Sequence, residues 1–165
     1  MDTPQRDFDL DALARRCESQ RAAGRRVVLC HGCFDLLHVG HVRYLEAARG
    51  LGDLLMVTVT PDRFVGKGPG RPVFPEAQRA EMLAALKPVD GVAINRWPTA
   101  IETLGLLCPA VYAKGAEYRA ASEDPASPVG QERVAVEAVG GRLTLIDLPK
   151  FSSTSVLKRY SESFS

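Results

Sequence analysis

Short apolar segments and amphipathic segments alternate along this chain of 165 residues. The apolar segments are rich in β-branched residues and lie near 27–31, 54–60, 90–95, 110–113 and 142–147. Strands that are covered on both faces of a parallel sheet have such continuous apolar runs. Because apolar residues recur at helical spacing between the runs, the chain predicts an α/β domain with a doubly wound parallel sheet of about five strands and flanking helices.

The N-terminal region carries a helical pattern of its own. Within residues 8–23, apolar side chains recur at Leu10, Leu13, Ala14 and Cys17. We expect this amphipathic helix, within residues 1–24, to pack on the main domain of residues 25–165 or to form an interface. Residues 119–130 are rich in Ala, Ser, Pro and Gly and predict an exposed loop ahead of a helix near 131–139.

All three histidines lie within residues 31–41, where the first predicted strand gives way to a helix. From Gly40 to Ala48 apolar residues recur at helical spacing, so His38 and His41 lie in or just before the first helical turn, on one face. Backbone N–H groups are unpaired there, and the helix dipole favours negative charge. Gly40 lets a ligand or the backbone approach closely. The segment therefore predicts a binding site for a polyphosphate.

The histidines have two other interpretations. In one, His38 is a capped surface residue and His41 packs against the sheet. In the other, both bind zinc together with Cys30 and Cys33, although no further Cys or His cluster completes a typical zinc site. The clustering of every histidine in one short segment favours the phosphate site over both alternatives.

The segment Gly32-Cys-Phe-Asp-Leu-Leu-His-Val-Gly-His41 resembles the HxGH signature of the nucleotidyltransferase superfamily, in the form found in its cytidylyltransferase-like branch. The resemblance implies a Rossmann-like fold in which His38 and His41 stabilise charge on the α-phosphate, with no covalent enzyme intermediate. Such reactions depend on positioning and charge neutralisation. It also implies nucleotide contacts at Gly32, Cys33, Phe34, Asp35 and Gly40. Alternatively, Asp35 orders the turn through backbone hydrogen bonds or helps to hold a metal.

Further matches extend the resemblance from near residue 26 to near residue 160. Lys67-Gly-Pro-Gly-Arg71-Pro-Val resembles the flexible basic loop that closes over the triphosphate in nucleotidyltransferase domains of the ADP-heptose synthase type. Lys67 is then a catalytic cation and Arg71 a nucleotide ligand, with an ordinary solvated loop as the alternative. Arg79 lies on a helix that begins near Pro75, and the family counterpart of this helix faces the active site. We expect Arg79 to contact the nucleotide or to form a surface salt bridge.

Two segments nearer the C-terminus complete the resemblance. Lys114-Gly-Ala-Glu-Tyr118 follows a predicted strand and resembles a Lys-Gly-Gly-Asp-Tyr pattern of the family. The nucleotide contacts that it implies are Lys114, Gly115, Glu117 and Tyr118. Glu117 can accept a hydrogen bond from the exocyclic amine of a base, and Tyr118 can line or stack on the base. Ser153 and Thr154 precede another helical pattern, where they cap the helix or bind the β- and γ-phosphates.

Composition narrows the range of partners. The net charge of +1 and the pI of about 7.7 argue against a dedicated nucleic-acid or membrane surface. No apolar run approaches the roughly 20 residues that span a bilayer, so we expect a cytoplasmic protein. Mg²⁺ is the expected cofactor, bound mostly by the nucleoside triphosphate, and no protein residue is assigned as its ligand. The family resemblance also implies a homodimer, and the polar C-terminal tail predicts one domain of a longer, fused polypeptide.

These observations predict a nucleotidyltransferase that releases pyrophosphate. Resemblance to glycerol-3-phosphate cytidylyltransferases, and to the phosphonate cytidylyltransferase domains of antibiotic pathways such as fosfomycin, favours transfer of CMP from CTP to a small phosphate or phosphonate. Resemblance to ADP-heptose synthase favours the alternative, an adenylyltransferase that forms an ADP-sugar from ATP and a heptose-type sugar 1-phosphate. Alternatives of other classes are a non-catalytic nucleotide-binding domain and a thiol-redox role for Cys30 and Cys33.

Overall fold

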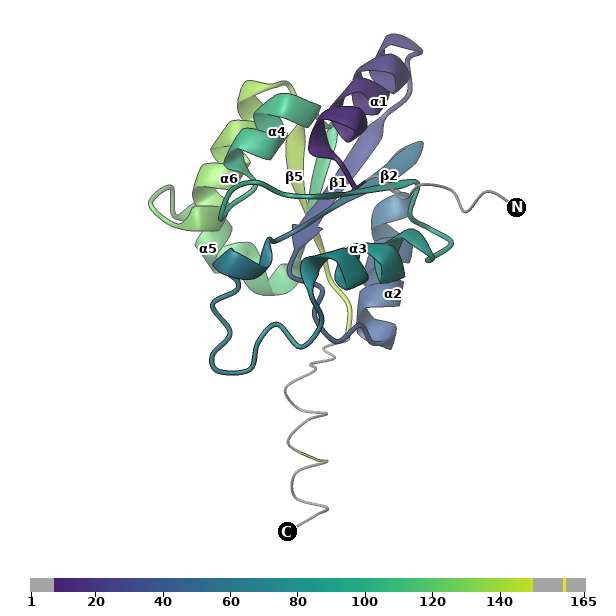
Figure 1. Cartoon of the computed structure of the whole chain (residues 1–165). Helices are drawn as coiled ribbons and strands as arrows, with labels where there is room; N and C mark the ends of the chain where they lie inside the picture. The colour runs from purple at the N-terminus through teal and green to yellow at the C-terminus, as the bar shows by residue number, and fades with distance from the viewer. Residues whose placement is uncertain (1–7, 150–158, 160–165) are drawn as a thin grey trace, which may run out of the picture.

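The computed structural model describes residues 8–149 and 159 (Figure 1). Five strands form one parallel sheet in the order β3-β2-β1-β4-β5. They are β1 Val27–Gly32, β2 Leu54–Val59, β3 Gly91–Ile94, β4 Val111–Gly115 and β5 Arg142–Ile146. The doubly wound, Rossmann-like sheet predicted from the sequence is confirmed, and each strand begins within one residue of its predicted start.

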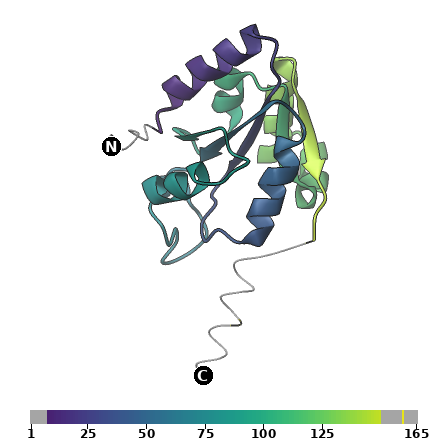
Figure 2. The ribbon, with the colours of Figure 1, turned by 90° about the vertical axis from the view of Figure 1, so that its right-hand side faces the viewer.

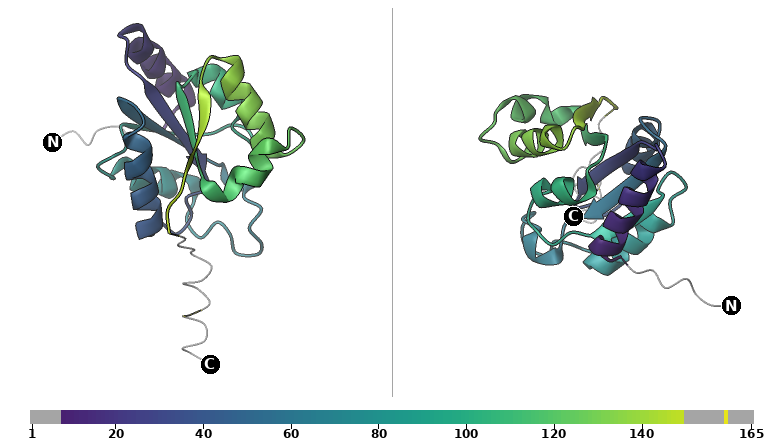
Figure 3. Two further views of the ribbon diagram at one scale, coloured as in Figure 1. Left: turned by 180° about the vertical axis from the view of Figure 1, so that it is seen from behind. Right: turned by 90° about the horizontal axis from the view of Figure 1, so that it is seen from above.

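The helices form two layers, one on each face of the sheet. Their bounds are α1 Leu10–Ala22, α2 Val39–Arg49, α3 Glu76–Ala84, α4 Ile101–Leu107, α5 Arg119–Glu123 and α6 Pro128–Ala138, with short 3₁₀ helices η1 Asp62–Phe64 and η2 Ala116–Tyr118. Helices α1, α4 and α6 pack on one face, and α2 and α3 pack on the other. The left view of Figure 3 shows α2 and α6 on opposite sides of the sheet.

The central strand β1 explains why the strands carry continuous apolar runs. Val27 and Leu29 join the core beneath α1, α4 and α6, whereas Val28 and Cys30 join the core beneath α2 and α3. All four side chains are fully buried. Burial stabilises each aliphatic side chain by roughly 1.5–3 kcal/mol relative to exposure. Both helix layers are therefore held to the same strand.

The amphipathic helix predicted within residues 8–23 is present as α1. Asp9 caps it by accepting a hydrogen bond from the backbone N–H of Ala12 at 2.9 Å, and Leu10, Leu13 and Cys17 are buried. Figure 2 shows α1, in purple, along one side of the domain. Across residues 8–149, no helix has the length and apolar character needed to cross a membrane.

The exposed loop predicted over residues 119–130 is confined to residues 124–127. This segment contains α5 and the first turn of α6, which begins at Pro128. Ser127 Oγ accepts a hydrogen bond from the backbone N–H of Gly130 at 2.9 Å, and Pro128 occupies the first turn of the helix. The Ser, Pro and Gly residues that suggested a loop therefore form the start of a helix. The pattern also did not single out the short helix α4.

One buried side chain of β1 is polar. His31 is 7% exposed, and its Nδ1 lies 2.9 Å from Thr58 Oγ1 on the neighbouring strand β2. Burial, with a smaller contribution from the nearby charge of Lys114, lowers the pKa of His31 to about 3. The imidazole is therefore neutral in the folded protein near pH 7, because desolvation disfavours the charged form.

The neutral state of His31 predicts sensitivity to mild acid. An unfolded histidine titrates near pH 6.5, so below that pH the unfolded chain binds a proton that folded His31 does not bind until the pH falls to about 3. The free energy of unfolding therefore decreases as the pH falls through this window. His31→Asn removes this titrating group. Between pH 7 and pH 5, the free energy of unfolding of the variant should therefore fall by about 2 kcal/mol less than that of the wild type. Urea denaturation of both proteins at both pH values measures the difference, and equal losses would contradict a neutral, buried His31.

Candidate active site

A cavity of about 460 Å³ opens at the carboxyl edge of the sheet. It lies beside the ends of β1 and β4, where the strand order reverses, and ligands of open α/β sheets bind at such points. The site residues predicted from the sequence that line it are Gly32, Cys33, Phe34, His38, Gly40, His41, Lys67, Lys114, Gly115, Glu117 and Tyr118. The fold thus brings together the turn before α2, the loop after η1, and the end of β4 with η2.

The histidine pair begins helix α2. His38 is the N-cap residue, and its Nδ1 accepts a hydrogen bond from the backbone N–H of Gly40 at 3.1 Å. The backbone N–H of His38 in turn donates to Nδ1 of His41 at 3.3 Å, and the two ring centroids are 4.0 Å apart. Because Nδ1 accepts in both rings, the neutral imidazoles carry their protons on Nε2. The start of α2 thus holds two imidazole donors side by side.

Both imidazoles are neutral near pH 7. Burial lowers the pKa of His41 to about 4, with smaller contributions from His38 and Lys67. Burial also lowers the pKa of His38. A neutral imidazole offers a hydrogen bond without a full charge, and the N-terminal end of α2 adds partial positive charge. The full positive charges among the lining residues belong to Lys67 and Lys114.

The turn between β1 and α2 contains two non-glycine residues in the left-handed region. Phe34 has φ of 51° and Leu36 has φ of 54°, a conformation that costs roughly 1–2 kcal/mol for a residue with a side chain. Such residues persist where the surrounding structure fixes them. The Phe34 ring is buried, and its centroid lies 5.8 Å from that of His41. The turn is therefore held in one strained shape beside the histidine pair.

Lys67 is an exposed residue of the loop between η1 and α3. Figure 1 shows this loop beyond the carboxyl edge of the sheet. Gly68 and Gly70 have φ of 99° and 72°, and a Cβ added at either would meet nothing within 4 Å. Glycine adopts such angles without steric cost. The loop therefore combines a positive charge with a backbone that has room to change conformation.

The opposite wall of the cavity begins at the end of β4. The Lys114 ammonium group lies 3.3 Å from the carbonyl oxygen of His31 and 3.8 Å from Glu132 Oε2. It also lies 5.1 Å from the centroid of the Tyr118 ring. At Gly115 a Cβ would stand 2.1 Å from Glu117 Oε2, so Glu117 folds back over the glycine. The wall thus presents a buried cation, a carboxylate and an aromatic ring.

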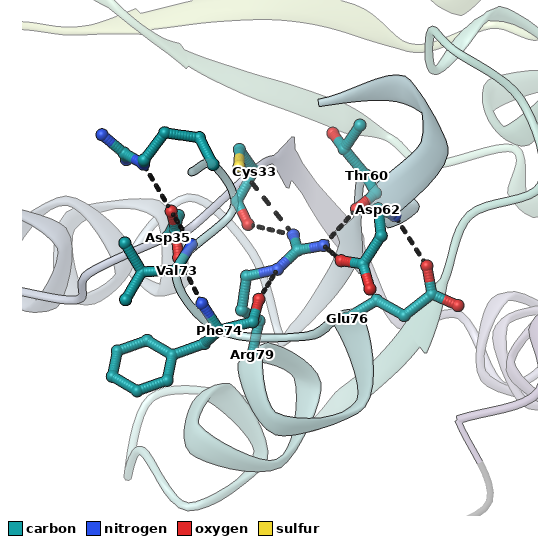
Figure 4. A network of polar contacts seen from close by, with 9 residues as sticks. Cys33, Asp35, Thr60, Asp62, Val73, Phe74, Glu76 and Arg79 are labelled. Atoms are coloured by element: carbon teal, nitrogen blue, oxygen red, sulfur yellow. Dashed lines mark hydrogen bonds and ion pairs between the residues drawn. The ribbon is translucent and has the colours of Figure 1, made fainter. Parts of the chain in front are cut away.

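Three predicted site residues lie beside the cavity and are absent from its described lining: Asp35, Arg71 and Arg79. The Asp35 carboxylate is fully buried and pairs with Nε of Arg71 at 2.7 Å. The Arg79 side chain is also fully buried, and its Nη2 pairs with Asp62 Oδ1 at 2.7 Å (Figure 4). Because the Arg79 side chain is buried, its ion pair with Asp62 is not a surface salt bridge, although the Asp62 side chain is partly exposed.

Sequence reasoning missed five residues that line the cavity: His31, Tyr44, Ile146, Leu148 and Pro149. The sequence did carry a signal for Tyr44, because it lies three residues after His41 on the same helix face. Its hydroxyl donates to the carbonyl oxygen of Ala113 on β4 at 2.7 Å, which joins α2 to the opposite side of the cavity. The predicted ligands Ser153 and Thr154 lie outside the described residues.

Within residues 8–149, no group of three or more His, Cys, Asp or Glu side chains is arranged to hold a metal ion. All four cysteines of the chain are unpaired. Burial raises the pKa of the Cys30 thiol to about 12. Since thiolates are the reactive form, Cys30 is unsuited to redox exchange with Cys33 in the folded protein.

Comparison with known proteins places the chain in a family. The family model described as cytidylyltransferase-like matches residues 29–159. Among curated proteins, the bifunctional protein HldE of Pelobacter propionicus is 43% identical over 158 residues, and HldE of Methylobacillus flagellatus is 44% identical over 153 residues. Each alignment covers 92% of this chain but only 31% and 30% of the respective relative, so the chain spans about a third of their length.

Solved structures agree on the fold. The lipopolysaccharide core biosynthesis protein of Thermoplasma volcanium is 25% identical, with a TM-score of 0.59, over 78% of this chain and 100% of that protein. Pantothenate synthetase of Thermus thermophilus is 16% identical, with a TM-score of 0.56, over 85% of this chain and 65% of that enzyme, a likeness of fold alone. With the family model spanning most of the sequence and the HxGH residues gathered in the cavity, the chain belongs to the cytidylyltransferase-like family and is a nucleotidyltransferase.

Proposed function

We propose that the chain transfers the adenylyl group of ATP to the phosphate of a heptose-type sugar 1-phosphate, forming an ADP-sugar and pyrophosphate. The observation that carries this proposal is the similarity to HldE proteins over 92% of the chain. It agrees with the resemblance of residues 67–73 and 114–115 to nucleotidyltransferase domains of the ADP-heptose synthase type. The sequence-based preference for CTP thus gives way to its alternative.

The proposed reaction is an in-line displacement at the α-phosphorus. An oxygen of the sugar phosphate forms a new bond to the α-phosphorus, the bond to the bridging oxygen of the β-phosphate breaks, and pyrophosphate leaves with that electron pair. No protein nucleophile is needed. Neutral His38 and His41 donate from Nε2 to the α-phosphate oxygens, where negative charge builds up in the transition state. The start of α2 adds its dipole, and Lys67 supplies a full charge.

The nucleotide is proposed to bind as its Mg²⁺ complex. The Asp35 carboxylate, the acidic group nearest the histidines in sequence, accepts three hydrogen bonds and is fully buried, so it does not offer oxygens to a cation. The triphosphate itself supplies hard oxygen ligands of the kind Mg²⁺ prefers. The metal is therefore proposed to enter as part of the substrate, where it offsets charge on the phosphates.

The wall formed by β4 and η2 is proposed to hold the base. Glu117 can accept a hydrogen bond from the exocyclic amine of adenine, and the Tyr118 ring can stack on the base or line its pocket. Lys114 is proposed to contact the acceptor or nucleotide phosphates. Ser153 and Thr154 are retained as proposed ligands of the β- and γ-phosphates.

Cytosine also carries an exocyclic amine, which supports a second candidate, transfer of CMP from CTP to a small phosphate or phosphonate. The third candidate is a domain that binds nucleotide without catalysis. Two neutral imidazoles held at the α2 terminus argue against that candidate, because donors placed for charge that develops only in the transition state contribute little to ground-state binding.

Pyrophosphate release distinguishes the three candidates. We expect release with MgATP and heptose 1-phosphate at a kcat/KM at least about a hundredfold above that with MgCTP. The same panel includes glycerol 3-phosphate and 2-hydroxyethylphosphonate as acceptors. Faster release with MgCTP and one of the latter acceptors would select the second candidate, and nucleotide binding without release from any pair would select the third.

Substitution of His41 tests the proposed catalytic pair. In His41→Asn the side-chain oxygen can still accept from the backbone N–H of His38, but the Nε2 donor is lost. We expect kcat to fall by about 10²–10³-fold while the affinity for nucleotide changes much less, because the donor acts mainly in the transition state. Steady-state kinetics and equilibrium nucleotide binding measure the two effects. If nucleotide affinity and kcat fell by the same factor, His41 would act only as a ligand of the ground state.

A further inference from the structure

We propose that Asp35 and Arg79 are positioning residues that anchor the loop carrying Lys67 and hold the turn before α2, so that the loop tip alone rearranges over the triphosphate. The part of this proposal that concerns ATP rests on the proposed function. The anchoring itself rests on contacts within the chain, and Figure 4 shows how they converge.

Asp35 holds the C-terminal end of the loop. Its Oδ2 accepts hydrogen bonds from Nε of Arg71 at 2.7 Å and from the backbone N–H of Val73 at 2.8 Å, and its Oδ1 accepts from the backbone N–H of Phe74 at 3.1 Å. Burial raises the pKa of Asp35, but these three donors outweigh it and bring the pKa below its usual value. An ionised, buried carboxylate with all its donors in place forms strong hydrogen bonds. Residues 71–74 are therefore fixed to the turn before α2.

Arg79 contacts both ends of the loop and the turn after β1. Its Nε donates to the carbonyl oxygen of Phe74 at 2.9 Å, and its Nη1 donates to the carbonyl oxygen of Cys33 at 2.6 Å. Its Nη2 donates to the carbonyl oxygen of Thr60 at 2.8 Å and to Asp62 Oδ1 at 2.7 Å. A single guanidinium thus ties the turn after β1, the end of β2 and both ends of the loop.

Each N–H group of the Arg79 guanidinium already has an acceptor within the protein. A guanidinium has five N–H groups, and the contacts above, together with the Sγ of Cys33 at 3.9 Å from Nη1, account for them. The side chain is fully buried. A phosphate contact would require Arg79 to give up one of these bonds inside the protein, which carries a large desolvation cost. The geometry therefore favours a positioning role over direct nucleotide binding.

The anchored turn is the strained one. Asp35 stands between Phe34 and Leu36, the two residues with positive φ, and Cys33 just before them is held by Arg79. Strained backbone is retained when several contacts fix it at once. The same two side chains therefore keep Phe34 against His41 and keep the loop ends in register with the histidine pair.

Between the anchors lie residues 65–70, which hold Lys67 and the three glycines of the loop. The N-terminal anchor is reinforced by the backbone N–H of Asp62, which donates to Glu76 Oε2 at 2.7 Å. With both ends fixed, closure of the loop orders only this short tip, so the conformational entropy lost on binding triphosphate is small. Release of one anchor would lengthen the segment that must be ordered.

Asp90 provides a matched control for Asp35. Its Oδ2 also accepts from an arginine Nε, that of Arg49 at 3.0 Å, and from a backbone N–H, that of Leu55 at 2.8 Å. Asp90 precedes β3, at the edge of the sheet opposite the cavity. Asp35→Asn and Asp90→Asn therefore remove the same kind of contact, and only the first lies at the loop.

The first readout is cleavage of the ligand-free protein by trypsin after Lys67, followed by mass spectrometry. We expect Asp35→Asn to be cleaved there at least about fivefold faster than the wild type, because loss of the negative charge and of one acceptor oxygen loosens residues 71–74. Asp90→Asn should be cleaved at the wild-type rate. This readout requires neither ATP nor catalysis, so it decides the anchoring even if the proposed reaction is wrong.

The second readout is steady-state kinetics. We expect Asp35→Asn to raise KM for MgATP by about tenfold and to leave KM for the sugar phosphate unchanged. A substitution that only destabilised the fold would reduce the fraction of folded enzyme. It would therefore lower the apparent kcat and leave both KM values unchanged. Equal cleavage after Lys67 in the two aspartate variants, or an unchanged KM for MgATP in an active Asp35→Asn enzyme, would overturn the proposal.

A second pair of variants covers the case in which Asp35→Asn does not fold. Arg71→Met removes one donor from Asp35, and Arg49→Met removes the corresponding donor from Asp90. Faster cleavage after Lys67 in Arg71→Met alone would support the anchor. Indistinguishable cleavage in the two folded arginine variants would count against it.

Discussion

The reversal of strand order beside β1 is the constraint on which the rest of the structure depends. From β1 the chain builds β2 and β3 on one side, and it then crosses back to build β4 and β5 on the other. Because crossovers between parallel strands are right-handed, α2 and α3 cover one face and α4 and α6 cover the other. The segments that leave β1 and β4 turn toward opposite faces, and the cavity is the space between them.

The electrostatics of the cavity follow from what the fold buries there. His31, His38 and His41 all lose proton affinity through burial, so the fixed part of the site near the sheet offers hydrogen bonds and a helix terminus. Of the two lysines among the described lining residues, Lys114 is fixed at the end of β4 and Lys67 lies on a glycine-rich loop. Under the proposed function, part of the charge that neutralises the triphosphate therefore arrives with a movement of this loop.

Local patterns allowed much of this arrangement to be predicted from the sequence. The strands are visible because both faces of each are covered, and the histidine pair is visible because a strand end and a helix start lie within one short segment. The roles of Asp35 and Arg79 are not local, since the partners of Asp35 lie 36 to 39 residues away and Arg79 reaches Cys33 at a separation of 46 residues. A charged residue on a helix suggests a surface or a ligand when its burial is unknown. The N-terminal cap and first turn of α6 resemble a loop in sequence because both use Ser, Pro and Gly.

The two walls of the cavity are built by separate stretches of chain, and this separation has an evolutionary consequence. The rings of the two histidines are bonded to backbone N–H groups at the start of α2, whereas Lys114 of the other wall is bonded to His31 on β1 and to Glu132 on α6. Substitutions at Glu117 or Tyr118 leave the hydrogen bonds of the histidine pair intact. Under the proposed function, in which the wall with Glu117 and Tyr118 holds the base, a lineage with this fold can therefore exchange one nucleobase preference for another without rebuilding the histidine pair.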